Sequence, residues 1–167
     1  MKRIFTILLC LLLLMPALLS CRHREATLAE GVAAMQKAEK PSPAGRLYVL
    51  SAPPDDPAHP SDSLLAAMFG EGNASLPAAF DHVEDAAFFL SYTDACELAV
   101  FDCDNADGTR EVSRMCLRRL DLLRHYRTGD TDAAMLQKAQ VVIRGNLVIL
   151  LISKDPEGAL RALRRTL

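Results

Sequence analysis

The cysteines are the residues of this 167-residue chain with the widest range of possible chemistry, and the chain contains five of them. Thiols act as nucleophiles, metal ligands, disulfide partners and sites of lipid attachment. Three of the five, Cys96, Cys103 and Cys116, lie in the second half of the chain. Cys21 directly follows a long apolar stretch, so its surroundings differ from those of the other three.

The spacing of the three later cysteines does not favour a disulfide. Cys96 and Cys103 are seven residues apart on one expected strand, which places them about 23 Å apart and on opposite faces. A disulfide requires Cα atoms within about 7 Å. Cys116 lies on the helix expected next, roughly 13 Å from the start of that helix. This position lies over the middle of the strand and away from the cysteines at both of its ends. We therefore expect buried, unpaired cysteines that pack as small apolar residues.

Other groups that could do chemistry are scattered or incomplete. No Cys-x-x-Cys is present, and the histidines His23, His59, His82 and His125 do not cluster, so no metal site is expected. The 102–108 segment is similar to a calcium loop, but Gly108 comes one position late and Ser113 stands where the acidic ligand belongs. A solvated loop, in which Asp107 caps the next helix, explains the same residues.

Six arginines follow the same expected helix: Arg110, Arg114, Arg118, Arg119, Arg124 and Arg127. They could bind lipid headgroups or an acidic partner, but a solvated outer helix face is the preferred interpretation. Without Lys2 and Arg3, 17 basic side chains face 21 acidic ones, which does not fit a nucleic-acid partner. No phosphate loop, Ser-His-Asp order or nucleophile elbow is present, so no enzyme and no cofactor are predicted.

The first twenty residues have the organisation of a secretory signal. Lys2 and Arg3 precede the 4–19 stretch, which is apolar except for Thr6 and is interrupted by Pro16. A permanent membrane span requires about 20 apolar residues, so this shorter stretch is marginal as a span and is better explained as a signal. The segment ends in Leu18-Leu19-Ser20-Cys21, which resembles the lipobox of bacterial lipoproteins.

The lipobox resemblance implies cleavage after Ser20 and acylation of the Cys21 thiol, with palmitate as the type of chain. Cys21 would then hold the protein on the extracytoplasmic face of the cell membrane, because each buried CH₂ contributes about 0.8 kcal/mol. The alternatives are an ordinary signal peptide with an incidental cysteine, or an uncleaved anchor. The expected organisation is therefore a signal peptide at 1–20, a tether at 21–60 and one domain at 61–167.

The tether is expected because its pattern is weak and rich in proline. Helical periodicity over 22–40 is weak, carried by Leu28, Val32 and Met35, and favours a polar tether helix at best, and six prolines lie between positions 41 and 60. A short strand at 46–51 is also expected there. Residues 22 to about 60 would then act largely as a spacer between the membrane and the folded part.

The remaining chain predicts an α+β domain with a small, mainly antiparallel sheet and helices packed on one face, a two-layer sandwich. The expected elements are a helix from the Ser61 region to Gly70, strands at 86–90 and 96–101, a helix at 109–126, a helical turn at 133–139, a hairpin at 140–153 and a helix after Asp155. Gly145-Asn146 suits a type I′ or II′ turn. The apolar run within 147–152 indicates a strand that is central or covered on both faces.

The order of these elements resembles a family of small bacterial lipoproteins, the domain of unknown function 4358 family. The resemblance covers about residues 62–167 and is carried by Glu97-Leu98-Ala99-Val100-Phe101, the arginine-bearing helix, the 141–152 hairpin and the helix after Asp155. It implies an anchored extracytoplasmic domain and brings no catalytic residues. The proline-rich spacer and the three later cysteines depart from the family.

We therefore expect a lipid-anchored, non-enzymatic binding or assembly module with the membrane, through Cys21, and an envelope protein as partners. A small thiol-dependent enzyme built on one free cysteine is the first alternative. A solute-binding lipoprotein is the second, although about 105 folded residues with few aromatics leave little room for an enclosed pocket.

Overall fold

The computed structural model describes residues 26–70, 75–127 and 129–167. Within these ranges, five strands form one antiparallel sheet in the order β1-β2-β3-β5-β4. The strands are β1 (Gly45–Val49), β2 (Val83–Ser91), β3 (Glu97–Cys103), β4 (Gln140–Arg144) and β5 (Leu147–Ile152). The predicted α+β class and antiparallel sheet are confirmed.

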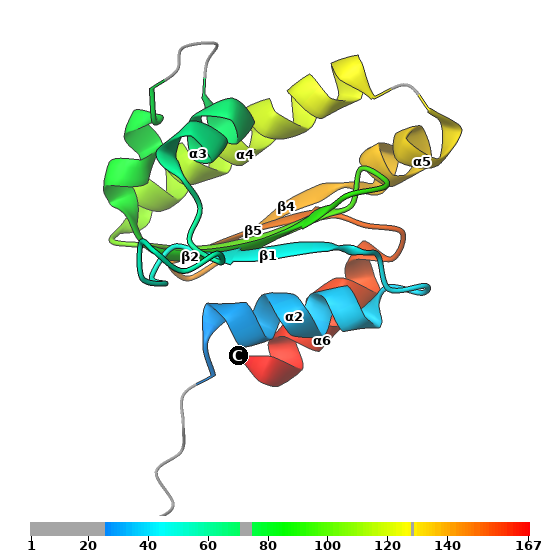
Figure 1. Cartoon of the computed structure of the whole chain (residues 1–167), viewed down its shortest axis with the longest axis horizontal. Helices are drawn as coiled ribbons and strands as arrows, with labels where there is room; N and C mark the ends of the chain where they lie inside the picture. The colour runs from blue at the N-terminus through cyan, green and yellow to red at the C-terminus, as the bar shows by residue number, and fades with distance from the viewer. Residues whose placement is uncertain (1–25, 71–74, 128) are drawn as a thin grey trace, which may run out of the picture.

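Helices cover both faces of the sheet, so the described part has three layers (Figure 1). One face carries α2 (Leu28–Ala38) and α6 (Pro156–Thr166), and the other carries α3 (Asp62–Phe69), η1 (Ala78–His82), α4 (Ala106–Tyr126) and α5 (Asp130–Lys138). The prediction that helices pack on one face only was wrong. The physical reason is that the central strands are apolar on both sides, and each side must be covered.

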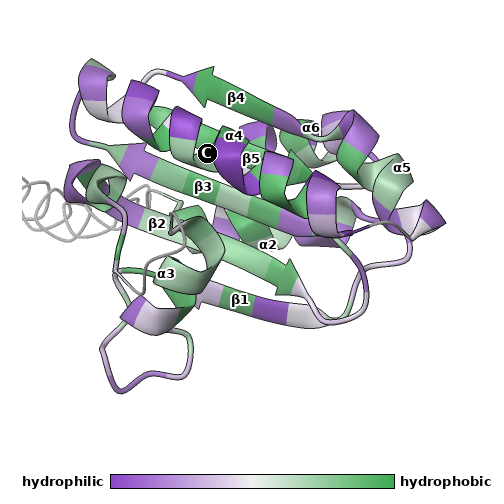
Figure 2. Cartoon of the chain, turned by 90° about the horizontal axis from the view of Figure 1, so that it is seen from above, coloured by the Kyte–Doolittle hydropathy of each residue, from purple (hydrophilic) through white to green (hydrophobic). Residues whose placement is uncertain are grey.

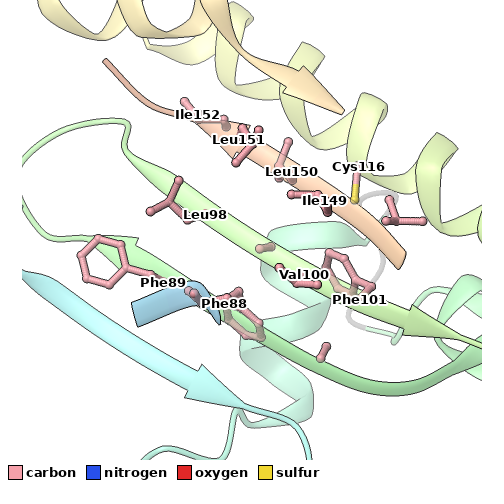
Figure 3. Close-up of a cluster of buried hydrophobic side chains, with 14 of the residues drawn as sticks. Phe88, Phe89, Leu98, Val100, Phe101, Cys116, Ile149, Leu150, Leu151 and Ile152 are labelled. Carbon is pink, nitrogen blue, oxygen red and sulfur yellow. The ribbon is translucent and has the colours of Figure 1, made fainter. Parts of the chain in front are cut away.

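The register of β3 and β5 explains their continuous apolar sequences. The Phe101 ring packs against Phe69 of α3, with 5.6 Å between the ring centroids. Directly opposed residues point to the same face of a sheet, so Phe101 and its partner Val148 lie on the side covered by α3 and α4. Val100 and its partner Ile149 lie on the α2–α6 side. All four side chains are fully buried, and Figure 3 shows Val100, Phe101 and Ile149 within the core cluster.

The β4–β5 connection is a two-residue turn, as predicted. Gly145 has φ +58°, and no residue other than glycine has a positive φ in the described part of the chain. The φ of Asn146 is therefore not positive. A positive φ at the first central residue alone, here Gly145, is typical of a type II′ turn, whereas a type I′ turn requires it at both.

The segment expected to be a spacer is largely folded. Val32 and Met35 of α2 are fully buried, and β1 pairs with β2 along its whole length. The buried Glu39 carboxylate, at the end of α2, accepts hydrogen bonds from the Ser153 hydroxyl and from the Lys154 N–H. The described fold thus begins near residue 26. A weak tether helix and a short strand were expected in this segment, but their packing into the domain was not.

The helix ends follow the predicted caps with one exception. Ser61 caps α3, and Asp155 caps α6 with Pro156 as its first residue. The cap of α4 is Asn105, whose side chain accepts hydrogen bonds from the N–H groups of Asp107 and Gly108 at 2.8 and 2.9 Å. Asp107 itself lies in the first turn, so its predicted capping role was wrong.

The predicted signal peptide, the Ser20-Cys21 cleavage site and the lipidation site lie outside the described residues. No helix in the described ranges is long and apolar enough to cross a bilayer.

Candidate functional site

The three later cysteines are buried and unpaired, as predicted. Cys96 immediately precedes β3 and Cys103 ends it, whereas Cys116 lies on α4 and points toward the sheet (Figure 3). The fold therefore uses these residues as apolar packing groups and does not gather them into one site.

Burial also sets the protonation state of these thiols. It raises the pKa of Cys96 to about 12, and the nearby negative charges of Glu39 and Asp94 contribute in the same direction. Burial likewise raises the pKa of Cys103 and of Cys116. Because a thiolate is the reactive form, all three are poor nucleophiles near neutral pH.

The acidic 102–108 segment has a structural role in starting α4. Besides the Asn105 cap, Asp104 lies 3.2 Å from Nδ1 of His82, and Glu111 lies 3.8 Å from Nε2 of the same ring. The hydrogen bond to Asp104 raises the pKa of His82. Among the described residues, no group of three or more His, Cys, Asp or Glu side chains is placed to hold a metal ion.

Three arginines on α4 and at its C-terminal cap attach that helix to the rest of the fold. Arg119 pairs with the buried Glu97 carboxylate of β3 at 3.0 Å. Arg124 donates to the main-chain carbonyl of Leu136 in α5 at 3.1 and 3.3 Å. Arg127 pairs with Asp132 at 3.3 Å, and Arg110 pairs with Asp107 in its own helix. Figure 2 shows the hydrophilic residues along α4.

Among the open grooves beside α4, two lie on its α3 and η1 side. The first, of about 540 Å³, is lined by Phe69, Gly70, Arg118, Arg119, Asp121, Leu122 and His125, and we call it the α3–α4 groove. The second, of about 330 Å³, is lined by residues 75–79 with Glu111, Arg114 and Arg118. The α3–α4 groove is the more apolar of the two, and the exposed Leu117, Leu122 and Tyr126 lie on the same helix.

A second group of arginines lies on the opposite layer and was missed by the sequence analysis. Arg161, Arg164 and Arg165 of α6 are exposed, and Arg144, Gly145, Leu147, Arg164 and Leu167 line a shallow depression of about 580 Å³. The spacing of the apolar residues in the sequence could have indicated this group. The inward positions of Leu160 and Leu163 place Arg161, Arg164 and Arg165 on the outer side of α6.

No family model, no curated protein and no solved structure matches this chain. Membership of the domain of unknown function 4358 family stays a prediction.

Proposed function

We propose that this protein is a bacterial lipoprotein, anchored through Cys21 on the extracytoplasmic face of the membrane, that acts as a non-enzymatic binding or assembly module. The observation that carries the proposal is the Leu18-Leu19-Ser20-Cys21 sequence, which lies only six residues ahead of the N-cap of α2, Thr27. Acyl chains on Cys21 would hold a folded domain beside the bilayer without a transmembrane helix.

The state of the thiols supports binding over the thiol-dependent alternative. An enzyme of that kind needs an accessible cysteine with a lowered pKa. The pKa values of Cys96, Cys103 and Cys116 are all raised by burial. The groups that would have to do the chemistry are thus neutral and covered by the fold.

The α3–α4 groove is the surface we assign to an envelope protein partner. It lies on the layer opposite α2, where the described chain begins (Figure 1). A domain anchored ahead of α2 would therefore present this groove away from the anchor. Leu122 is 42% exposed and Tyr126 is 74% exposed, and exposed apolar side chains beside arginine are typical of binding surfaces.

Labelling of cells with radioactive palmitate tests the anchor. The full chain should take up label, the Cys21→Ala variant should not, and the Cys10→Ala variant, which removes the cysteine inside the apolar segment, should label normally. Equal labelling of wild type and Cys21→Ala would refute lipidation at Cys21. Mass spectrometry of the first residue would identify the cleavage site independently.

Site-specific photocrosslinking in intact cells tests the binding role. A photoreactive residue at Leu122 should give one discrete adduct with an envelope protein. The same residue at Tyr92, which is exposed in the β2–β3 connection, is the matched control and should not. Absence of a discrete adduct at Leu122, in a protein that labels with palmitate, would refute the groove assignment and leave the anchor unaffected.

A further inference from the structure

The outer side of α6 carries a run of arginines that the fold uses little. Arg161, Arg164 and Arg165 are exposed at helical spacing, and Arg144 lies across the shallow depression from Arg164. We call these four residues the α6 basic surface. In the described part of the chain, Arg161 makes one distant ion pair with Asp155, at 3.8 Å, and the other three have no ion-pair partner.

This surface differs in that respect from three arginines on α4 and at its C-terminal cap. Arg119, Arg124 and Arg127 each hold α4 to another element. On α6, the acidic residues Asp155 and Glu157 are at the start of the helix, whereas the basic residues gather in its last two turns. The end of α6 is therefore a positively charged area whose guanidinium groups are available to an external anion.

The α6 basic surface lies beside the point where the described chain begins. A Cβ atom placed on Gly31, in the first turns of α2, would be 2.7 Å from Cδ1 of Leu163 and 3.3 Å from Cδ1 of Leu167. The start of α2 and the end of α6 are thus in direct contact. Figure 1 shows the C-terminus next to the beginning of α2.

The distance to the proposed anchor is short. Thr27 is six positions after Cys21, and an extended chain spans at most about 3.5 Å per residue, or about 21 Å in total. Two of the intervening residues, Arg22 and Arg24, are also basic. An acylated Cys21 would keep the end of α6 within a few Debye lengths of the headgroups, since that length is about 8 Å at physiological salt.

We propose that the α6 basic surface docks on a bilayer that contains anionic phospholipid, and that this contact orients the domain with its α2–α6 layer toward the membrane. The proposal rests on the proposed lipidation of Cys21. Arginine binds phosphate oxygens through two parallel N–H groups. Each basic side chain near an anionic leaflet strengthens the contact by about fivefold. Leu167, which is 46% exposed beside Arg164, adds apolar contact at the same place.

The test uses the lipidated full-length protein reconstituted into vesicles that contain a quencher-labelled lipid. A fluorophore is attached to Asn146→Cys, in the turn beside Arg144, or to Tyr126→Cys at the end of α4. Both positions are exposed, whereas the three described native cysteines are buried. The vesicles contain phosphatidylcholine alone or phosphatidylcholine mixed with phosphatidylglycerol.

Lipid quenching of the Asn146 fluorophore should rise several-fold when phosphatidylglycerol is present, and the Tyr126 fluorophore should respond little. About 1 M salt should abolish the difference, because it shortens the Debye length to about 3 Å. The Arg164→Gln/Arg165→Gln variant should lower the docked-to-undocked ratio by about tenfold or more. The matched Arg110→Gln/Arg114→Gln variant removes the same charge from α4 and should behave as wild type.

Quenching at Asn146 that does not depend on phosphatidylglycerol would overturn the proposal, as would stronger quenching at Tyr126 or no effect of Arg164→Gln/Arg165→Gln. Those results would indicate that the surface serves an acidic protein or only solubility. Co-flotation with phosphatidylcholine vesicles reports the acyl anchor separately. A protein that floats but does not orient refutes docking and retains the proposed anchor, and a protein that does not float refutes the anchor.

Discussion

At the residue scale, burial decides the reactivity of Cys96, Cys103 and Cys116. We expect a thiol reagent at neutral pH to modify none of them rapidly in the folded protein, and to modify all three after denaturation. The folded-state rate at Cys96 should stay far below that of a free thiol, because burial raises its pKa to about 12 and the thiolate is the attacking form. Ellman's reagent, used with and without guanidinium chloride, measures the rate of modification in the denatured and in the folded protein. Rapid, selective modification of one of the three at neutral pH would favour the thiol-dependent alternative.

The Glu97–Arg119 pair gives a second prediction at this scale. The Glu97 side chain is 4% exposed and that of Arg119 is 18% exposed, so removal of the arginine leaves an unpaired carboxylate among apolar groups. We expect Arg119→Met to lower the free energy of unfolding by about 3 kcal/mol, measured by urea denaturation.

The double variant separates the loss of charge pairing from the loss of packing. Glu97→Met/Arg119→Met removes both charges and should recover most of the stability, because a buried pair can often be replaced by apolar side chains of similar volume. A double variant no more stable than Arg119→Met would show that the arginine acts mainly by packing.

Residue-scale predictions from sequence succeeded where a residue's own chemistry dominates. The cysteines could be placed in the core because their expected strand and helix positions prevented pairing and a small apolar role remained. Glu97 and Arg119 are 22 residues apart, and their pairing depends on how α4 crosses β3. Local sequence does not predict where a helix crosses a strand, so Arg119 was expected to be one of the solvated arginines.

At the element scale, the start of α4 distinguishes two capping residues. Asn105 accepts from two backbone N–H groups, whereas Asp107 lies inside the first turn and pairs with Arg110. We expect Asn105→Ala to cost about 1 kcal/mol of stability, and Asp107→Ala to cost only about 0.3–1 kcal/mol through the helix dipole. Thermal or urea unfolding compares them, and a larger loss for Asp107→Ala would restore the cap predicted from the sequence.

Elements with a strong local signal were predicted closely. The Ser61 and Asp155 caps and the Gly145-Asn146 turn each satisfy a geometric requirement within a few residues. The packing role of α2 was missed because its contact surface consists partly of Gly31 and small alanines, which give little hydropathy contrast. Its place in the core comes from close approach to Leu163 and Leu167, which lie more than a hundred residues later.

At the scale of the whole molecule, substitutions in α2 test whether the fold begins near residue 26 or near residue 61. Met35 is fully buried between α2 and the sheet, whereas Lys37 is exposed on the same helix. We expect Met35→Ala to lower the free energy of unfolding by about 2–5 kcal/mol. Lys37→Ala should change it by less than about 0.5 kcal/mol. Equal, negligible effects in urea denaturation would show that this segment is a spacer after all.

The three-layer arrangement could not be predicted from the sequence for a related reason. A strand run that is apolar at every position, such as 147–152, indicates two covered faces, but it does not identify what covers them. Once 22–60 was assigned to a spacer, too few helices remained for a second layer. The correct placement of α2 and the three-layer fold are therefore one result.

The contact between the beginning of α2 and the end of α6 also limits how the protein can be tagged. A reporter domain fused after Leu167 would emerge next to the α6 basic surface and would occupy the space that we propose for headgroup contact. An insertion in the largely exposed 51–59 segment between β1 and α3 would avoid that crowding, and surface loops of this kind tolerate added sequence. Localisation studies with C-terminal fusions would thus alter the contact that they set out to observe.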